Sequence, residues 1–133
     1  MNTLQYGIKA EKSEIGPEAE DQFQWLEENL KEAQASGRKF ILISHIYAGA
    51  RVNHDDTQSV SSMWDSDYNS RYFDLLLAYK DQVMLEVGGH DHWEDIRVYK
   101  NKHGDIYRNL IIATGVGLDH GQLPGFNTLK VAN

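Results

Sequence analysis

Two short apolar runs, each followed by a histidine, constrain the fold of this chain more than any other feature. Residues 39–44 read Lys-Phe-Ile-Leu-Ile-Ser, and His45 follows them directly. Residues 83–87 read Val-Met-Leu-Glu-Val, and a glycine pair then leads to His90. Near-continuous apolar runs of this length are typical of strands that are covered on both faces. Because sites in open α/β sheets gather outside the carboxyl ends of the strands, we expect His45 and His90 at equivalent positions.

The second run ends in two histidines that are separated by one residue, within the sequence Gly-Gly-His-Asp-His-Trp. If the backbone stays extended there, its period of two directs the imidazoles of His90 and His92 to one side and Asp91 to the other. Neutral imidazole is the commonest protein ligand for zinc and similar ions, so the pair could hold a metal. An isolated pair of this kind is more often two hydrogen-bonded turn histidines, and His45 is the third candidate ligand that favours a metal site.

The rest of the chain reads as α/β units that give way to hairpins near the paired histidines. Hydrophobic periodicity, helix-start residues and turn residues predict the elements. They are a strand at 3–8, a helix from Pro17 to Gly37, the strand at 39–44, a helix at 66–80, the strand at 83–87, strands at 95–99 and 107–114, and, after a glycine-rich loop at 115–125, a final strand at 126–131. Up to residue 114 the order is β-α-β-α-β-β-β, which predicts the α/β (α+β) class.

Composition argues against several classes of function. The 133 residues suffice for one core, and no apolar run approaches the ~20 residues of a membrane span. The net charge of −7 argues against a broad nucleic-acid surface, although a phosphate substrate stays open because a bound metal can dominate the local field. The chain has no cysteine, which excludes disulfides and thiolate metal sites, and no signal segment is visible. These features weakly favour a cytoplasmic location and leave the compartment unknown.

Five short segments carry a resemblance to a known family. They are Phe-Gln-Trp-Leu at 23–26, Ile-Ser-His at 43–45, Tyr-Asn-Ser-Arg-Tyr at 68–72, Gly-His-Asp-His at 89–92 and Pro-Gly-Phe at 124–126. With these segments the chain resembles the C-terminal half of a calcineurin-like metallophosphoesterase, and within that family the acid-sphingomyelinase-like phosphodiesterases. The Gly-His-x-His motif is fairly specific when a strand-end histidine lies well upstream of it, as His45 does here.

The resemblance implies a four-layer αββα sandwich with a dinuclear metal centre between its two sheets. By this resemblance His45 and His90 bind one divalent ion and His92 binds its neighbour, with zinc, manganese or iron as the metals. Such a pair of ions activates a water as hydroxide and stabilises the phosphoryl group during its transfer. The implied function is the hydrolysis of phosphodiester or nucleotide-type phosphate substrates. Candidates for contacts with the substrate are Tyr47, Trp93 and His120.

The chain also departs from the family pattern. The family's Asp-x-His and Gly-Asn-His-Glu motifs do not occur in this sequence, and no Gly-Asp motif precedes His45 to supply the bridging carboxylate. Directly after His45, Ile46 and Tyr47 stand where the family usually has a pair of prolines. The resemblance therefore implies that residues 1–133 are a single partial domain whose metal site is incomplete or empty. We expect the chain alone to be inactive, and either to require its N-terminal half or to self-associate.

Two other functions are compatible with the same residues. His45, His90 and His92 could form a self-contained mononuclear zinc site with an open position for water, as in hydratases. The chain could also be a non-catalytic module that binds metal weakly or serves as an interaction domain, because the acidic ligands are missing. Metal stoichiometry distinguishes the two enzyme classes, since a complete phosphoesterase site holds two ions and the zinc site holds one.

Overall fold

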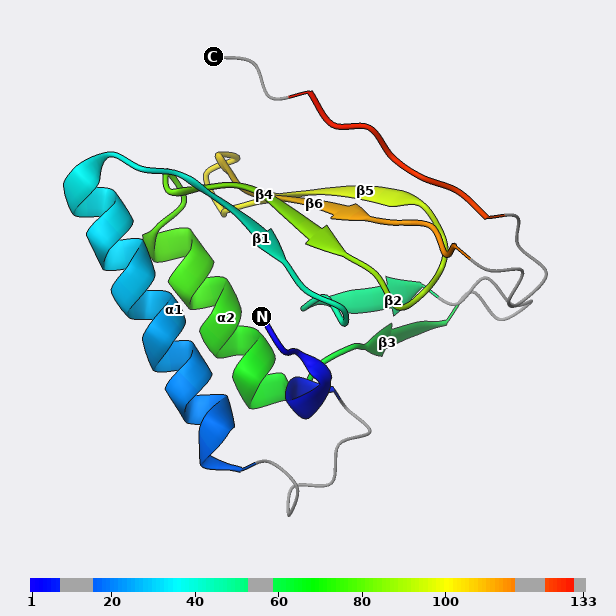
Figure 1. Cartoon of the computed structure of the whole chain (residues 1–133), viewed down its shortest axis with the longest axis horizontal. Coiled ribbons are helices and arrows are strands. Elements are labelled where there is room, and N and C mark those ends of the chain that lie inside the picture. The colour runs from blue at the N-terminus through cyan, green and yellow to red at the C-terminus, as the bar shows by residue number, and fades with distance from the viewer. Residues whose placement is uncertain (8–15, 53–58, 117–123, 131–133) are drawn as a thin grey trace.

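Two helices lie side by side on one face of a four-stranded sheet in the computed structural model (Figure 1). The structure describes residues 1–7, 16–52, 59–116 and 124–130. Its elements are the 3-10 turn η1 (Leu4–Tyr6), helix α1 (Pro17–Ser36), strands β1 (Phe40–Ile43), β2 (Ala50–Val52) and β3 (Val60–Ser62), helix α2 (Ser66–Ala78), and strands β4 (Val83–Gly88), β5 (Asp95–Lys100) and β6 (Ile106–Ile112). The predicted mixed α/β class is therefore confirmed, whereas the four-layer sandwich stays a prediction.

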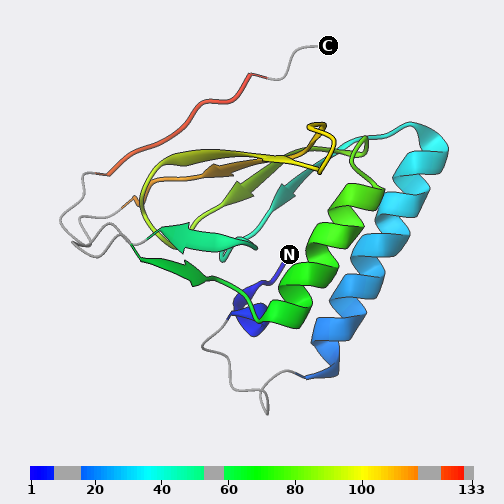
Figure 2. The same ribbon diagram turned by 180° about the vertical axis from the view of Figure 1, so that it is seen from behind.

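The order of the strands brings the ends of the two apolar runs together. The sheet has the order β1-β4-β6-β5, in which the first three strands are parallel and β5 runs antiparallel to β6 at one edge. Ile43 pairs with Val87, so β1 and β4 end level with one another. The short strands β2 and β3 form a separate hairpin, which Figure 2 shows from behind. The segments that follow β1 and β4 consequently leave the sheet at neighbouring points.

Both helices form for reasons that are local in the sequence. Pro17 opens α1, and Gly37 closes it with a left-handed φ of 70°, where its N–H bonds to the carbonyl of Ala33. The face of α1 that is buried consists of Ala19, Phe23, Leu26, Leu30 and Ala33. The Asp65 side chain caps α2 by accepting from the N–H of Asp67. The predicted helices are confirmed, and within the described residues neither is long and apolar enough to cross a membrane.

An aromatic cluster packs η1 against the helices and the segment before α2. The ring centroids of Tyr6 and Trp64 lie 4.7 Å apart, and the Phe23 ring meets Tyr6 edge-on at 5.2 Å. The indole N–H of Trp64 donates to the carbonyl oxygen of Ile46 at 3.0 Å. The Thr3 hydroxyl accepts from the backbone N–H of Ile46 at 2.9 Å. Because these partners are buried, they fix the backbone just beyond β1.

A buried ion pair links β4 to β6 under the helices. The Arg108 guanidinium donates to both carboxylate oxygens of Glu86, with 3.0 Å from Nη2 to Oε2, and the Tyr72 hydroxyl donates to the same carboxylate at 2.9 Å. Aromatic rings surround the guanidinium, and the Tyr99 ring centroid lies 4.5 Å from its Cζ. Nη2 also donates to the Ala48 carbonyl at 3.0 Å. The pair therefore holds the loop after β1 as well as the two strands.

Two of the predicted strands are wrong. The segment predicted as a strand at 3–8 contains the turn η1, because Thr3 and Tyr6 both point into the core, a spacing that a strand does not provide. The strand predicted at 126–131 does not form over residues 126–130, where Phe126 is 89% exposed and the backbone joins neither sheet. Residue 131 lies outside the described residues. The other predicted strands are confirmed to within two residues, and β2 and β3 occupy what was expected to be loop.

The face of the sheet that points away from the helices is apolar and open. Four aliphatic side chains on the edge strands are between 41% and 68% exposed. They are Ile41 and Ile43 on β1 and Ile96 and Val98 on β5. The strand register places Val87 and Ile111 on the same face, in a row between Ile43 and Ile96. An exposed apolar row of this kind is typical of a surface that another layer or another chain covers.

Candidate functional site

His45 and His90 meet where β1 and β4 end. His45 Nε2 lies 3.4 Å from His90 Nδ1, and the two rings are nearly perpendicular, with an interplanar angle of 88°. The backbone fixes this approach, because the N–H of Gly89 donates to the His45 carbonyl at 2.9 Å. Two nitrogens bound to one tetrahedral zinc ion also lie about 3.4 Å apart, given Zn–N bonds of about 2.0–2.1 Å. The pair therefore has the spacing of two ligands of a single ion.

The backbone between the paired histidines turns sharply and is not extended. His90 has a φ of 79° and His92 a φ of 62°, and the N–H of Asp91 bonds to the carbonyl of Gly89 at 3.1 Å. Both histidines are thus in the left-handed region, which is uncommon for residues with a side chain. The period-two argument that placed both imidazoles on one side is wrong for this reason. Residues in this region often lie at functional sites, held there by their surroundings.

His92 contacts the segment that follows β6. Its ring packs against Gly115, where an added Cβ would come within 2.8 Å of the ring's Cγ. The carbonyl of His92 accepts from the N–H of Gly115 at 3.4 Å, so the segment after β6 stays close to the motif. Among the residues that the structure describes, no group of three or more His, Cys, Asp or Glu side chains is arranged to hold a metal ion. The assignment of His92 to a metal stays a prediction.

Asp91, between the two histidines, points into the protein. Its side chain is only 8% exposed and accepts a hydrogen bond from the Tyr47 hydroxyl at Oδ2. The Arg51 guanidinium forms an ion pair with its other oxygen, with 3.4 Å from Nε to Oδ1. Arg97 lies over the Tyr47 ring, 5.0 Å from the centroid. The sequence pattern directs Asp91 away from the two histidines, and in the structure its carboxylate is the group that anchors the motif.

Two pKa shifts at this site have a clear physical cause. Burial lowers the pKa of His90, and the nearby His45 and Arg51 lower it further, while the charge of Asp91 opposes them. The neutral imidazole, which is the form that binds metals, is thereby favoured. Burial and the hydrogen bond to Asp91 raise the pKa of the Tyr47 hydroxyl. The Tyr47 hydroxyl consequently keeps its proton at any ordinary pH, and it donates a hydrogen bond to the Asp91 carboxylate.

The candidates for substrate contacts occupy different environments. Tyr47 is buried, with its hydroxyl bonded to Asp91. Trp93 directly follows the motif and is exposed. His120 lies outside the described residues. Sequence reasoning missed Arg51 and Arg97, because an arginine in a polar loop or on a strand gives no signal of its partner until the fold is known.

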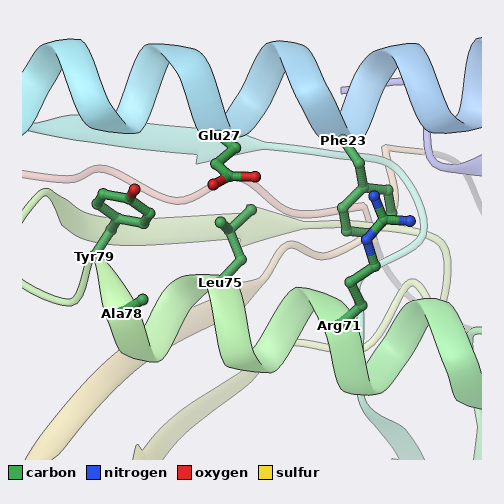
Figure 3. Close-up of a pocket in the computed structure, with 6 residues that line it drawn as sticks. All are labelled: Phe23, Glu27, Arg71, Leu75, Ala78 and Tyr79. Atoms are coloured by element: carbon green, nitrogen blue, oxygen red, sulfur yellow. The ribbon is translucent and has the colours of Figure 1, made fainter.

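A separate groove of about 220 Å³ runs between α1 and α2 (Figure 3). Its lining residues are Phe23, Glu27, Arg71, Leu75, Ala78 and Tyr79. The Arg71 guanidinium lies over the Phe23 ring, with 4.6 Å from Cζ to the centroid, and also pairs with Glu20. These contacts fill part of the groove. None of the candidate metal ligands His45, His90 and His92 lines it.

The fold and the strand-end histidines are compatible with a fragment of an α/β phosphoesterase. The chain is similar to acid-sphingomyelinase-like phosphodiesterases, as its sequence predicts. It is 29% identical over 96 residues to the human cyclic GMP-AMP phosphodiesterase SMPDL3A, covering 72% of this chain and 20% of that protein. It is 29% identical over 118 residues to sphingomyelinase phosphodiesterase D of Dictyostelium discoideum, covering 88% of this chain and 26% of that protein.

A third relative, the SMPDL3A protein of Mus musculus, is 25% identical over 96 residues, which cover 72% of this chain and 21% of that protein. The chain thus spans between a fifth and about a quarter of the length of these relatives. No protein-family model matches it. Because the relatives are phosphodiesterases, they support a phosphoesterase function and do not favour a mononuclear zinc enzyme or a non-catalytic module.

Proposed function

We propose that this chain forms part of a metal-dependent phosphoesterase in which His45 and His90 bind one divalent ion. The observation that carries the proposal is the 3.4 Å separation of their facing nitrogens at the level ends of β1 and β4. The similarity to phosphodiesterases supports the same reaction class. The alternative of a histidine pair that is only hydrogen-bonded requires one ring to donate and the other to accept, and it predicts no metal response.

The chain's own groups have defined tasks in this proposal. His45 and His90 would hold the ion, and the lowered pKa of His90 favours the neutral ring that can bind it. We assign His92 to a neighbouring ion, as the resemblance implies. Two ions held there would supply an activated water and positive charge opposite the phosphoryl group. The resemblance implies zinc, manganese or iron as the metal, of which zinc and iron suit imidazole ligands, and the proposed substrates are phosphodiesters or nucleotide-type phosphates.

The proposed site is incomplete within residues 1–133, since no Gly-Asp motif precedes His45 to supply the bridging carboxylate. We propose that the rest of the ligand set comes from an N-terminal half or from a second chain. The open apolar face of the sheet supports this, because strands that are apolar on both faces are normally covered on both. The isolated chain is then a metal-binding half-site that lacks substantial turnover.

A zinc titration of the purified chain tests the proposal. The ring nitrogen signals of the histidines are followed by NMR, with His103 as the internal control because it lies in an exposed turn. We expect zinc to shift the signals of His45 and His90 together. His90→Ala is expected to abolish the response of His45, and His103→Ala to leave it unchanged. A response that is equal at all histidines, or one that survives His90→Ala, overturns the assignment.

A further inference from the structure

A hydrogen bond between Tyr47 and Asp91 holds the turn that contains His90. Neither residue is one of the proposed metal ligands. Asp91 lies between two residues with left-handed backbone, and its side chain is turned inward to the Tyr47 hydroxyl. The direction of the Asp91 side chain and the direction of the His90 ring follow from the same backbone turn. Releasing Asp91 would therefore allow His90 to leave the left-handed region.

We propose that Tyr47 is a positioning residue that acts through Asp91 to hold His90 opposite His45. This inference rests on the proposed function, because it concerns how the two imidazoles are kept at the spacing of ligands. Tyr47 does not touch an ion or a substrate in this account. Its hydroxyl fixes the turn in advance, so that binding does not have to order it.

Tyr47 is suited to this role because its own backbone is fixed on both sides. Thr3 accepts from the N–H of Ile46 at 2.9 Å, and Arg108 donates to the carbonyl of Ala48 at 3.0 Å. Both side chains are almost completely buried. The backbone on one side of Tyr47 is thus bonded to Thr3 near the N-terminus, and the backbone on the other side is bonded to Arg108 of the buried ion pair.

The ring of Tyr47 is also confined. It packs on Gly88, the last residue of β4, where an added Cβ would lie 2.8 Å from the Cβ of Tyr47. On another side the Arg97 guanidinium lies 5.0 Å from the ring centroid, and Arg97 donates to the Ala50 carbonyl and pairs with Asp95. A ring with these neighbours has little freedom to move, so its hydroxyl is a stable reference point for Asp91.

Arg51 makes a weaker contribution to the same carboxylate. Its side chain is 42% exposed and its Nε lies 3.4 Å from Asp91 Oδ1. Exposed ion pairs are screened by solvent and contribute little. We therefore assign the positioning role to the buried hydroxyl, and Arg51→Ala is a comparison in which the carboxylate loses a partner but keeps Tyr47.

The test compares zinc affinities of the full chain and its variants, again from the ring signals of His45 and His90. Loss of a group that orients a metal ligand typically costs 10- to 100-fold in affinity. We expect Tyr47→Phe and Asp91→Ala each to weaken zinc binding about 10-fold. Asp91→Asn, which keeps an acceptor for the hydroxyl, should retain most of the affinity, and Arg51→Ala should change it less than Tyr47→Phe.

The double variant Tyr47→Phe/Asp91→Ala separates positioning from general destabilisation. If Tyr47 acts through Asp91, the double variant loses no more affinity than either single variant, whereas independent losses would multiply. Tyr68→Phe is the matched control, since its ring packs in the aromatic cluster with Tyr6 and Phe23. If Tyr47→Phe does not fold, the contrast between Asp91→Ala and Asp91→Asn decides the question.

The outcomes are distinguishable from a failure of the proposed function. Zinc binding that depends on His90 but is unchanged in Tyr47→Phe or equal in Asp91→Ala and Asp91→Asn overturns the positioning role alone. Wild-type chain without any zinc response at His45 and His90 overturns the metal site itself. The three-bond coupling that reports the φ of His90 gives a second readout without metal. It should lose its left-handed value in Asp91→Ala and keep it in Asp91→Asn.

Discussion

His45 Nε2 and His90 Nδ1 lie 3.4 Å apart although 45 positions separate the two residues in the chain. The separation follows from the parallel pairing of β1 with β4 and from the register that places Ile43 beside Val87. A shift of the register by one residue would turn the following segments to opposite faces. The site therefore depends on the packing that fixes this register, and the buried Glu86 on β4 is part of that packing.

Breaking the buried ion pair should strongly destabilise the fold. Arg108→Met leaves the Glu86 carboxylate buried without its cation, a change that costs about 3–5 kcal/mol for pairs of this kind. We expect a loss of that order in the free energy of unfolding, measured by urea denaturation. Arg38→Met removes the exposed pair with Glu32 and should cost less than about 1 kcal/mol. Equal effects of the two substitutions would show that the buried pair has no special weight.

The residues that gave correct predictions are those whose structure is decided locally. Pro17 and Gly37 bound α1, and the apolar runs at 39–44 and 83–87 form strands, because propensity, turn chemistry and burial agree there. The strand predicted at 3–8 was wrong because the packing of Tyr6 against α1 and Trp64 overrides the local pattern.

At the site, sequence reasoning identified the side chains but not their backbone. The left-handed turn at His90 and His92 depends on the inward contact of Asp91 with Tyr47, 44 positions earlier. No periodicity contains that information, because a contact between distant residues has no local signature. Glycines gave an indirect signal, since Gly88 and Gly115 leave the space that Tyr47 and His92 occupy.

Alkaline pH should lower the stability of the chain through its buried tyrosines. Burial raises the pKa of Tyr72 well above its ordinary value, with the Glu86 charge adding to the effect, and the pKa of Tyr47 is raised as well. Above about pH 10 the unfolded chain releases these protons while the folded chain retains them, so stability falls as pH rises from there. Below about pH 10 this contribution is constant. Urea unfolding between pH 8 and 11 measures the slope, which Tyr72→Phe should reduce; a flat profile contradicts the prediction.

Adding one methyl group at Gly88 should disturb the site more than adding one at Gly89. A Cβ at Gly88 would lie 2.8 Å from Tyr47 Cβ, whereas at Gly89 the nearest atoms of His45 are 3.7 Å away. Overpacking of a tight contact costs about 1–3 kcal/mol. We expect Gly88→Ala to lose stability in that range and to shift the ring signals of Tyr47, and Gly89→Ala to change both less. The reverse order of the two variants would contradict the packing described here.

The purified 133-residue chain should show little metal-dependent phosphodiesterase activity. Its sequence has no Gly-Asp motif before His45 to supply the bridging carboxylate, and loss of a ligand set should exceed the 10- to 100-fold effect of losing one orienting partner. An activated phosphodiester assayed with manganese or zinc measures this. Addition of EDTA and the variant His90→Ala serve as controls. Robust turnover that both controls abolish would mean that the chain contains a complete site.

The open apolar face of the sheet should cause the chain to associate. Ile43 and Ile96 lie at the ends of an apolar row across the four strands, and both are more than half exposed. Covering ~1,000 Å² of such surface contributes ~25 kcal/mol before the entropic costs of association. We expect the chain to self-associate at micromolar concentration, as measured by sedimentation velocity.

The double variant Ile43→Lys/Ile96→Lys should shift the population to monomer. The control Leu4→Lys/Leu77→Lys adds the same charge at exposed positions on η1 and α2, and it should leave the association unchanged. A wild-type chain that sediments as a monomer and unfolds cooperatively would show that the exposed face is stable in water. Equal effects of the two double variants would mean that added charge, and not loss of the apolar row, reduces the association.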